Sequence, residues 1–363
     1  MIALTKEYEV WPKETLRIPA FTLLGPITVD NCQFASFYRG KILSGTGKEI
    51  TPQGIFETTG IEKRYRLQSL GVTPRSIKET TPNLAIELVE GLMLTGKIDP
   101  VDLDYIFTCT SYPIGEKISS RVKNHLEANC VSMDVYAACS GPGYLLYRIA
   151  QVREQLGEEV NILLTAVEHY SAKIHELDLN NSIFSDGAAA VVLRLGRDFE
   201  ISSSRYIFEQ NDKAIRMPID YSLIPPGSLT MENIPNNVPF FKMHGPTVLR
   251  WFYTTPIQIL EEMYTEAVSG HEGNIEVVTH QGSGRIIKNI QEQMTARNID
   301  AHLSAQTVEK FGNLASGSSL AEFSALVNNP ETNLKKGDKI IFMCFGAGLA
   351  VAAVTLEVLR DLS

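Results

Sequence analysis

The sequence predicts an α/β fold in which buried, largely parallel strands alternate with helices. Two patterns indicate this fold. Short apolar stretches of strand length recur along the chain, and stretches with apolar residues at helical spacing lie between them. Several strand-like stretches are apolar throughout, as strands covered on both faces are.

The elements of the first half follow from these patterns. Residues 81–98 place Leu84, Leu88 and Leu92 at helical spacing, which predicts a helix. The segment VSMDVYAACSGPG is expected to be a strand that runs into a tight turn of small residues. The other expected elements are a strand at 104–110, helices at 117–128 and 143–156, and strands at 161–168 and 188–195.

The second half of the chain repeats this pattern. IEVVTHQGSG resembles YIFTCTSYP, KFGNLASGSSLAEFSALV resembles AACSGPGYLLYRIA, and IIFMCFGAGLAVAAVTLEV resembles NSIFSDGAAAVVLRL as a strand, glycine turn and strand. Three pairs in the same order suggest an internal duplication. We expect two halves, 1–204 and 241–363, joined by the proline-rich segment 205–240, which is either a connector or a cap over a pocket. Residues 36–54 form a further expected loop.

Composition excludes several classes of function. The chain has 363 residues and a net charge of −9, so it lacks the basic surface that nucleic-acid binding requires. No apolar run has the length of a membrane span, and the first residues contain no signal-peptide core. The five cysteines are scattered, odd in number and without metal-ligand spacing. We therefore expect a cytoplasmic protein with reduced thiols, no metal, no nucleic-acid partner and no membrane association.

Cys139 is the first candidate for chemistry. It lies where an apolar strand gives way to small residues and a helix, so unpaired backbone N–H groups and the helix dipole would favour its thiolate. The ordinary alternative is a small buried thiol.

His280 and Asn313 are the second and third candidates. His280 follows the strand IEVVT, at the carboxyl end where open α/β sheets bind ligands. A loop hydrogen bond is its ordinary alternative. Asn313 precedes an amphipathic run and would serve equally as a helix cap. In the comparison of the two halves, however, its position mirrors that of Cys139, so both side chains would project toward one centre.

The order Cys, His, Asn also occurs in papain-like proteases. Cys139 lies in mid-chain, and no C-G-[SA]-C-[WY] signature surrounds it. The protease interpretation is discarded.

Seven ordered segments carry a more specific resemblance, which spans nearly the whole chain. The sequence resembles β-ketoacyl-acyl-carrier-protein synthase III and its relatives in the thiolase superfamily. The segments are ETTGIEKRY, AACSGPGYLL, FSDGAAAVVL, FKMHGPTVLRW, THQGSGRII, GNLASGSS and CFGAGLA. The resemblance implies a thiolase-like fold of two duplicated halves in five layers, α/β/α/β/α, and a homodimer.

The resemblance also implies roles for individual residues. Cys139 would be acylated by an acyl-CoA or acyl-carrier-protein thioester, while His280 and Asn313 donate hydrogen bonds to the enolate of a malonyl-type extender. The backbone N–H groups of Cys139 and Ala347 would form an oxyanion hole, and no permanently bound cofactor is implied. Three further residues match substrate-binding positions: Phe345, Ser283 and Arg285.

The expected roles of some neighbouring residues are less specific. Arg285 and Lys288 would form a basic spot for coenzyme A phosphates or an acidic carrier, although solvated surface charges are as plausible. Asp186 and Gly187 are expected to shape a hairpin. Ser283 stands where the family has Asn, between two glycines, and this departure favours a relative in specialised, polyketide-type metabolism over the housekeeping fatty-acid initiator.

Three functions remain open at this point. The leading one is condensation of the Cys139 acyl group with a malonyl or β-ketoacyl thioester. A second is transfer of that acyl group to an alcohol, amine or thiol with His280 as base; Asn313 disfavours it, since such relatives tend to carry an acid there. A third is a non-catalytic partner subunit. A lyase of the hydroxymethylglutaryl-CoA synthase type would need a glutamate base, for which Glu168 is available by composition only.

Overall fold

The computed structural model describes residues 17–41, 47–72, 77–96, 98–211, 214–216 and 242–362. Most of the expected connector 205–240 and the centre of the expected loop 36–54 lie outside these ranges. The described ends of the expected loop belong to helices α1 (Asn31–Tyr38) and α2 (Pro52–Thr59).

Within the described residues, ten strands form the central sheet, and they divide into two matching sets. The first set has the order β1-β7-β6-β4-β5 and the second has the order β8-β14-β13-β11-β12. In each set the first two pairings are antiparallel and the last two are parallel. The bounds are β1 (Ala20–Leu24), β4 (Tyr105–Cys109), β5 (Val131–Val135), β6 (Val160–Glu168), β7 (Gly187–Leu195), β8 (Phe199–Phe208), β11 (Ile275–Thr279), β12 (His302–Ser304), β13 (Lys339–Gly346) and β14 (Ala350–Val358).

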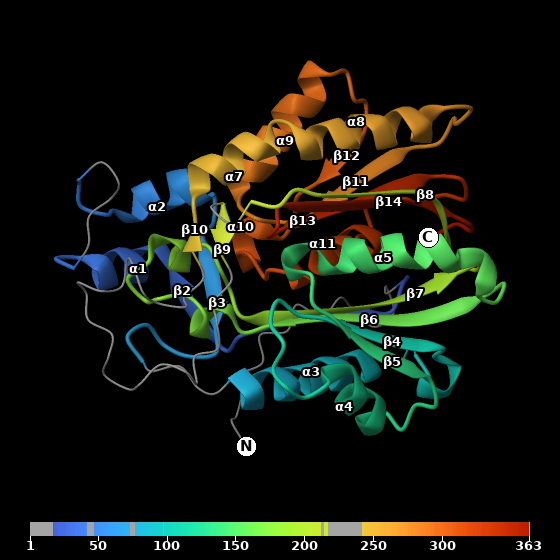
Figure 1. The fold of residues 1–363 in the computed structure, drawn as a ribbon, viewed down its shortest axis with the longest axis horizontal. Helices are drawn as coiled ribbons and strands as arrows, with labels where there is room; N and C mark the ends of the chain where they lie inside the picture. The colour runs from blue at the N-terminus through green and yellow to red at the C-terminus, as the bar shows by residue number, and fades with distance from the viewer. Residues whose placement is uncertain are drawn as a thin grey trace.

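Helices separate and cover the two sets, which gives five layers (Figure 1). Helices α3 (Ile77–Met93) and α4 (Ile118–His125) cover the outer face of the first set. Helices α8 (Thr255–Val268) and α9 (Gly284–Ala296) lie over the second. Between the sets lie α5 (Gly141–Val152) and α11 (Gly317–Asn328). The expected α/β/α/β/α arrangement of duplicated halves is confirmed.

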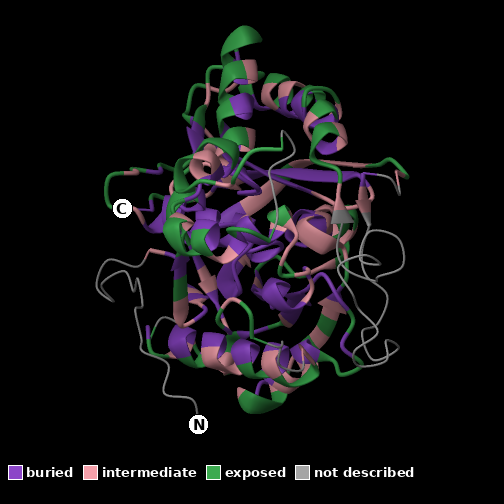
Figure 2. Ribbon diagram, turned by 90° about the vertical axis from the view of Figure 1, so that its left-hand side faces the viewer, coloured by how far each residue is buried: buried purple, intermediate pink, exposed green. Residues whose placement is uncertain are grey.

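Burial follows the layers, as Figure 2 shows. One hydrophobic cluster joins the two strand sets through α5 and α11, and one cluster lies under each outer layer. Every residue of α11 is buried. Leu84, Leu88 and Leu92 all pack in the cluster under α3, as their spacing predicts, although α3 ends before 98, where Gly96 turns the chain with a φ of 66°.

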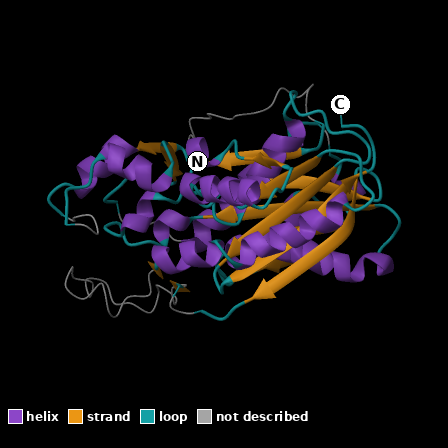
Figure 3. Ribbon diagram, turned by 90° about the horizontal axis from the view of Figure 1, so that it is seen from above, coloured by secondary structure: helices purple, strands orange, loops and turns teal. Residues whose placement is uncertain are grey.

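The shorter elements and many of the loops gather at one end of the molecule (Figure 3). They are the hairpin of β2 (Ile27–Asp30) and β3 (Lys63–Arg66), the pair β9 (Ile215–Arg216) and β10 (Lys242–Met243), α7 (Gly245–Phe252) and α10 (Val308–Phe311). Among the described residues, no helix is long and apolar enough to cross a membrane.

Two expectations about the halves differ from the structure. The boundary expected at 204 falls inside β8, which continues to Phe208 and belongs by its position to the second set. Residues 181–184 are not a strand. Leu179–Ser182 form a 3₁₀ turn instead, because the Asp178 side chain accepts a hydrogen bond from the Asn180 N–H and caps it. By its place in the strand order, β6 is the counterpart of β13, since each pairs antiparallel with the strand that follows it.

Candidate active site

Cys139 lies in the turn between β5 and α5. Ala138 before it adopts a left-handed φ of 46°, and α5 begins two residues after it. Gly346 packs directly against this turn, since a Cβ there would lie 3.0 Å from the Cys139 nitrogen and 2.8 Å from the Ser140 nitrogen. The glycine turn after β13 is therefore held in contact with the turn that bears the thiol.

The electrostatic setting of the Cys139 thiol differs from the expected one. Burial, and to a smaller extent the Glu168 carboxylate, hold its pKa well above the ordinary value, while a backbone N–H lowers it only in part. Desolvation of the charged form outweighs the helix terminus here. The surroundings of Cys139 in the unliganded site therefore oppose the thiolate that the helix terminus was expected to favour.

His280 follows β11 and is held by both its backbone and its ring. Its N–H donates to the Met343 carbonyl of β13 at 3.0 Å. The imidazole packs edge-on against Phe345 with ring centroids 5.3 Å apart. Burial lowers the pKa of His280 to about 3, so the ring is neutral at pH 7 and has one N–H donor. Its Nδ1 has no partner among the described residues.

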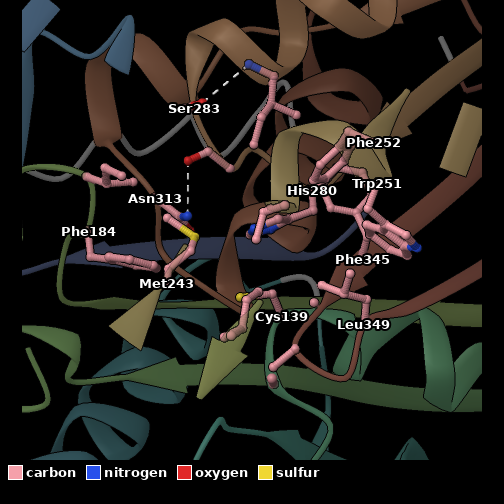
Figure 4. Close-up of a pocket in the computed structure, with 18 of the residues that line it drawn as sticks. Cys139, Phe184, Met243, Trp251, Phe252, His280, Ser283, Asn313, Phe345 and Leu349 are labelled. Carbon is pink, nitrogen blue, oxygen red and sulfur yellow. Dashed lines mark hydrogen bonds between the residues drawn. The ribbon is translucent and has the colours of Figure 1, made fainter. Parts of the chain in front are cut away.

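Asn313 is fixed in orientation by the turn before α11. Its Oδ1 accepts from the Ala315 N–H at 2.8 Å and from the Ser318 hydroxyl at 3.2 Å. Its Nδ2 donates to the Gly282 carbonyl at 3.1 Å. Because two donors occupy the oxygen, the amide nitrogen must point toward the His280 loop (Figure 4).

The comparison of the halves places a different residue opposite Cys139. Ala315 has a φ of 48°, like Ala138 at 46°. The Gly317 N–H donates to the Leu314 carbonyl, just as Ser140 donates to Ala137. Cys139 therefore corresponds to Ser316, and the expected equivalence with Asn313 was wrong by three residues.

One pocket brings the three candidates together. Cys139, His280 and Asn313 surround a cavity of about 80 Å³ (Figure 4). Its other walls are mainly apolar and come from β9, β10, α7 and the glycine turn after β13. The further lining residues include Tyr170, Ile183, Phe184, Ile215, Met243, Val248, Trp251, Phe252, Phe345, Ala347 and Leu349.

Known proteins match this chain along most of its length. The family model described as 3-oxoacyl-[acyl-carrier-protein (ACP)] synthase III matches residues 133–207, and the model of its C-terminal part matches 274–358. The β-ketoacyl-[acyl-carrier-protein] synthase III of Rickettsia massiliae is 28% identical over 291 residues, covering 77% of this chain and 86% of the relative. That of Syntrophomonas wolfei is 28% identical over 326 residues, covering 86% and 94%.

The chain is a ketoacyl-synthase III-like enzyme.

Solved structures have the same fold as this ketoacyl-synthase III-like enzyme. The 3-oxoacyl-(acyl carrier protein) synthase III of Pseudomonas aeruginosa PAO1 aligns with a TM-score of 0.71 at 18% identity, covering 95% of this chain and 98% of that one. The priming β-ketosynthase of the R1128 polyketide pathway aligns with a TM-score of 0.71 at 19% identity, covering 95% and 96%.

The remaining predicted residues of the ketoacyl-synthase III-like site fall into two groups. Phe345, Ser283 and Ala347 line the cavity. The Ser283 hydroxyl also caps α9 by accepting from the Ile286 N–H at 3.3 Å. Arg285 lies outside the cavity and is exposed on the first turn of α9. Lys288 is exposed too, with Glu292 3.9 Å away.

Sequence reasoning missed the wall formed by α7. Val248, Trp251 and Phe252 line the cavity, and the Trp251 indole is anchored by donating to Glu209 at 3.0 Å. Phe252 packs edge-on against Phe345, which in turn contacts His280. The helical spacing of these three residues was the available signal, but it indicates ordinary core packing equally well. Within the described ranges, no three His, Cys, Asp or Glu side chains gather closely enough to hold a metal ion.

Proposed function

We propose that this enzyme forms a carbon–carbon bond between an acyl group held on Cys139 and a malonyl or β-ketoacyl thioester. The observation that carries the proposal is the position of two neutral donors, His280 and Asn313, on the cavity that Cys139 lines. The Asn313 amide is locked with its nitrogen toward the His280 loop. Two fixed donors beside a nucleophile are what an enolate intermediate requires.

The first step is acylation. The Cys139 sulfur attacks the thioester carbonyl, a new carbon–sulfur bond forms, and the donor thiol leaves with the proton that Cys139 gives up. In our proposal the N–H groups of Cys139 and Ala347 bind the carbonyl oxygen. The close packing of Gly346 on the Cys139 turn supports this role, because it brings the two backbone segments together.

The second step is condensation. A malonyl thioester loses CO₂, and the negative charge moves to its thioester oxygen. His280 and Asn313 donate to that oxygen: a Cβ on Gly282 would lie 3.5 Å from His280 Nε2, and the Gly282 carbonyl binds Asn313 Nδ2. The enolate carbon then attacks the acyl-Cys139 carbonyl, the carbon–sulfur bond breaks, and the released Cys139 thiolate takes up a proton from water. Desolvation strengthens both hydrogen bonds.

The proposal extends to substrates and assembly. Acyl-CoA or acyl-carrier-protein thioesters are the donors, with Phe345 and Ser283 contacting the substrate and Arg285 available at the exposed start of α9. We infer a homodimer formed through β5, because this edge strand leaves Val131 59% and Met133 47% exposed. The five free cysteines agree with action in the reducing cytoplasm.

Intact-protein mass spectrometry tests the proposal. The protein is incubated with a panel of acyl-CoAs and then with malonyl-CoA or a β-ketoacyl thioester, beside the Cys139→Ala variant. We expect a mass increase of one acyl group that the alanine variant lacks and that the second substrate removes as a carbon–carbon product. Discharge only to alcohols or amines, or no acylation from any donor, would overturn condensation.

A further inference from the structure

A buried carboxylate that the proposed chemistry does not use lies at the end of β6. Glu168 is the last residue of β6 and is 1% exposed. Its Oε1 accepts four hydrogen bonds, while its Oε2 has no partner among the described residues. Burying a carboxylate with one unpartnered oxygen costs free energy, and the four hydrogen bonds to Oε1 leave the cost of desolvating Oε2 unmet.

The four donors come from the two halves of the molecule. Ser111, in the loop after β4 of the first half, donates from its N–H at 3.0 Å and from its hydroxyl at 2.8 Å. Ser316, before α11 of the second half, donates from its hydroxyl at 2.5 Å and from its N–H at 3.4 Å. Glu168 thus bridges the halves at the level of the active site.

The bridge leads directly to Asn313. Ser316 follows Ala315, whose N–H holds the Asn313 oxygen at 2.8 Å. Anything that shifts Ser316 therefore shifts the contact that keeps the Asn313 amide nitrogen pointing toward the His280 loop. On the other side, the charge of Glu168 opposes ionisation of Cys139.

We propose that Glu168 is a positioning residue of the condensation step, which ties the turn bearing Asn313 to the half bearing Cys139 through its hydrogen bonds to Ser316 and Ser111. This inference rests on the proposed function, since it assigns Asn313 to condensation and Cys139 to acylation. It gives the carboxylate two separable effects, one through geometry and one through charge.

Several titratable groups surround the carboxylate and enter its charge effect. The thiols of Cys139 and Cys109 and the phenol of Tyr170 all have their pKa raised by burial, with Glu168 adding to the rise. His169 follows it in the chain and lies 4.0 Å from Asp186. Burial raises the pKa of Glu168 itself to about 7, while the Ser316 and Ser111 hydrogen bonds lower it.

Two substitutions separate the effects. Glu168→Gln keeps an oxygen that accepts the same four donors and removes the charge. Glu168→Ala removes both. We therefore expect Glu168→Ala to slow condensation by about 10- to 100-fold, the cost of losing hydrogen bonds to a charged group, while acylation of Cys139 does not slow. Glu168→Gln should restore condensation to within about threefold of wild type.

The charge effect predicts a shift in a pH profile. In the wild type, Glu168 ionises as pH rises through about 7, which raises the pKa of Cys139 and flattens the rise of acylation rate with pH. In Glu168→Gln the acylation rate should rise with pH without this inflection. The midpoint of the rise should lie at a lower pH than in the wild type. A merely structural residue would not move this profile.

The experiment measures the two half-reactions separately on the full chain, by single-turnover acylation and by product formation from the pre-acylated enzyme. Glu322→Gln is the matched control, because Glu322 is also fully buried and accepts from Ser304, Gln306 and Thr307 away from the cavity. It should leave the ratio of the half-reactions and the pH profile unchanged. Ser316→Ala removes one arm of the bridge and should give a smaller condensation defect without the pH shift.

The outcomes are distinct. An unacylated wild type would reject the proposed function itself. With an active wild type, equal losses in both half-reactions for Glu168→Ala, or an unshifted profile in Glu168→Gln, would overturn the role of Glu168. If Glu168→Ala does not fold, the Gln and Ser316→Ala variants decide on the same two readouts.

Discussion

Two turns of the molecule have the same backbone conformation but differ in their side chains. The turn before α5 and the turn before α11 each contain an alanine with a left-handed φ, 46° at Ala138 and 48° at Ala315, and each is closed by the same N–H to carbonyl hydrogen bond. In the first turn the next residue is Cys139, which lines the cavity. In the second it is Ser316, which is fully buried and donates to Glu168.

If the proposed roles hold, this difference gives the two duplicated turns separate tasks. The first turn presents a side chain after its left-handed residue. In the second turn the residue after the left-handed Ala315 is Ser316, and its side chain points to Glu168. The residue that reaches the cavity is Asn313, two positions before Ala315. We propose that the nucleophile and the enolate donor came from equivalent loops whose functional positions moved apart.

The largest effect is expected when the nucleophile is removed from the first turn and a thiol is placed in the second. Cys139→Ala should reduce acylation by at least about a thousandfold, because the attacking atom is lost. Adding Ser316→Cys should not restore it, since the Ser316 side chain is enclosed against Glu168. Acyl transfer to the double variant, measured by intact mass, would contradict the assignment of the two turns.

Removing the donor of the second turn comes next. Asn313→Ala should lower condensation by about 100- to 1000-fold, the usual cost of one donor to a developing oxyanion, and leave Cys139 acylation within a few-fold of wild type. Single-turnover acylation and steady-state product formation measure the two effects. Asn328→Ala is the control, a buried asparagine whose Oδ1 accepts from Ile18 N–H at 3.1 Å away from the cavity. A parallel loss in both steps of Asn313→Ala would show disruption of the fold instead.

His280 in the second half and Glu168 in the first should change the free energy of unfolding in opposite directions as pH rises. Burial lowers the pKa of His280 to about 3, so the unfolded state alone binds this proton below pH 6.5 and stability falls as pH drops from 6.5 toward 3. Burial raises the pKa of Glu168 to about 7, so stability from the protonated carboxyl is lost as pH rises from 4.5 to 7. Each slope is at most ~1.4 kcal/mol per pH unit.

Denaturant unfolding at several pH values measures these slopes. In Glu168→Gln the free energy of unfolding should rise more steeply with pH between 4.5 and 6.5 than in wild type. In His280→Gln it should rise less steeply over the same range. Identical slopes in all three proteins would contradict both protonation assignments.

The smallest expected effect concerns the exposed start of α9. Arg285→Ala should raise KM for an acyl-CoA donor about two- to fivefold with kcat unchanged, and 0.5 M salt should erase the difference, as for other exposed charge contacts. Lys288→Ala is the control, because Lys288 has Glu292 within 3.9 Å. An Arg285→Ala effect that persists at high salt would point to a structural role of Arg285.

The sequence predicted most of this arrangement because its signals are local. Strand and helix periodicity predicted the α/β class. The resemblance carried by the seven motifs predicted the five layers and the grouping of Cys139, His280 and Asn313, which line one cavity. The apolar spacing of Leu84, Leu88 and Leu92 likewise reports which face of α3 is buried. Each of these signals spans fewer than about twenty residues.

The features that were not predicted depend on contacts between residues far apart in the chain. Ser111 and Ser316 lie 57 and 148 residues from Glu168, and no periodicity links them. The equivalence of Ser316 with Cys139 follows from backbone angles, which small-residue sequences leave open. The pKa of the Cys139 thiol was misjudged because desolvation by neighbouring layers is invisible in the local sequence.

The two outer edges of the central sheet are unlike each other. At one edge, β5 offers five residues with exposed Val131 and Met133; at the other, β12 has three residues, with His302 bonded to Glu276 at 2.6 Å. A short, charged strand resists further pairing, whereas a longer apolar one invites it. In the proposed homodimer, the sheet is extended once, by the β5 edge of a second copy. The short β12 edge disfavours further pairing among the described strands, so growth into fibres is not expected.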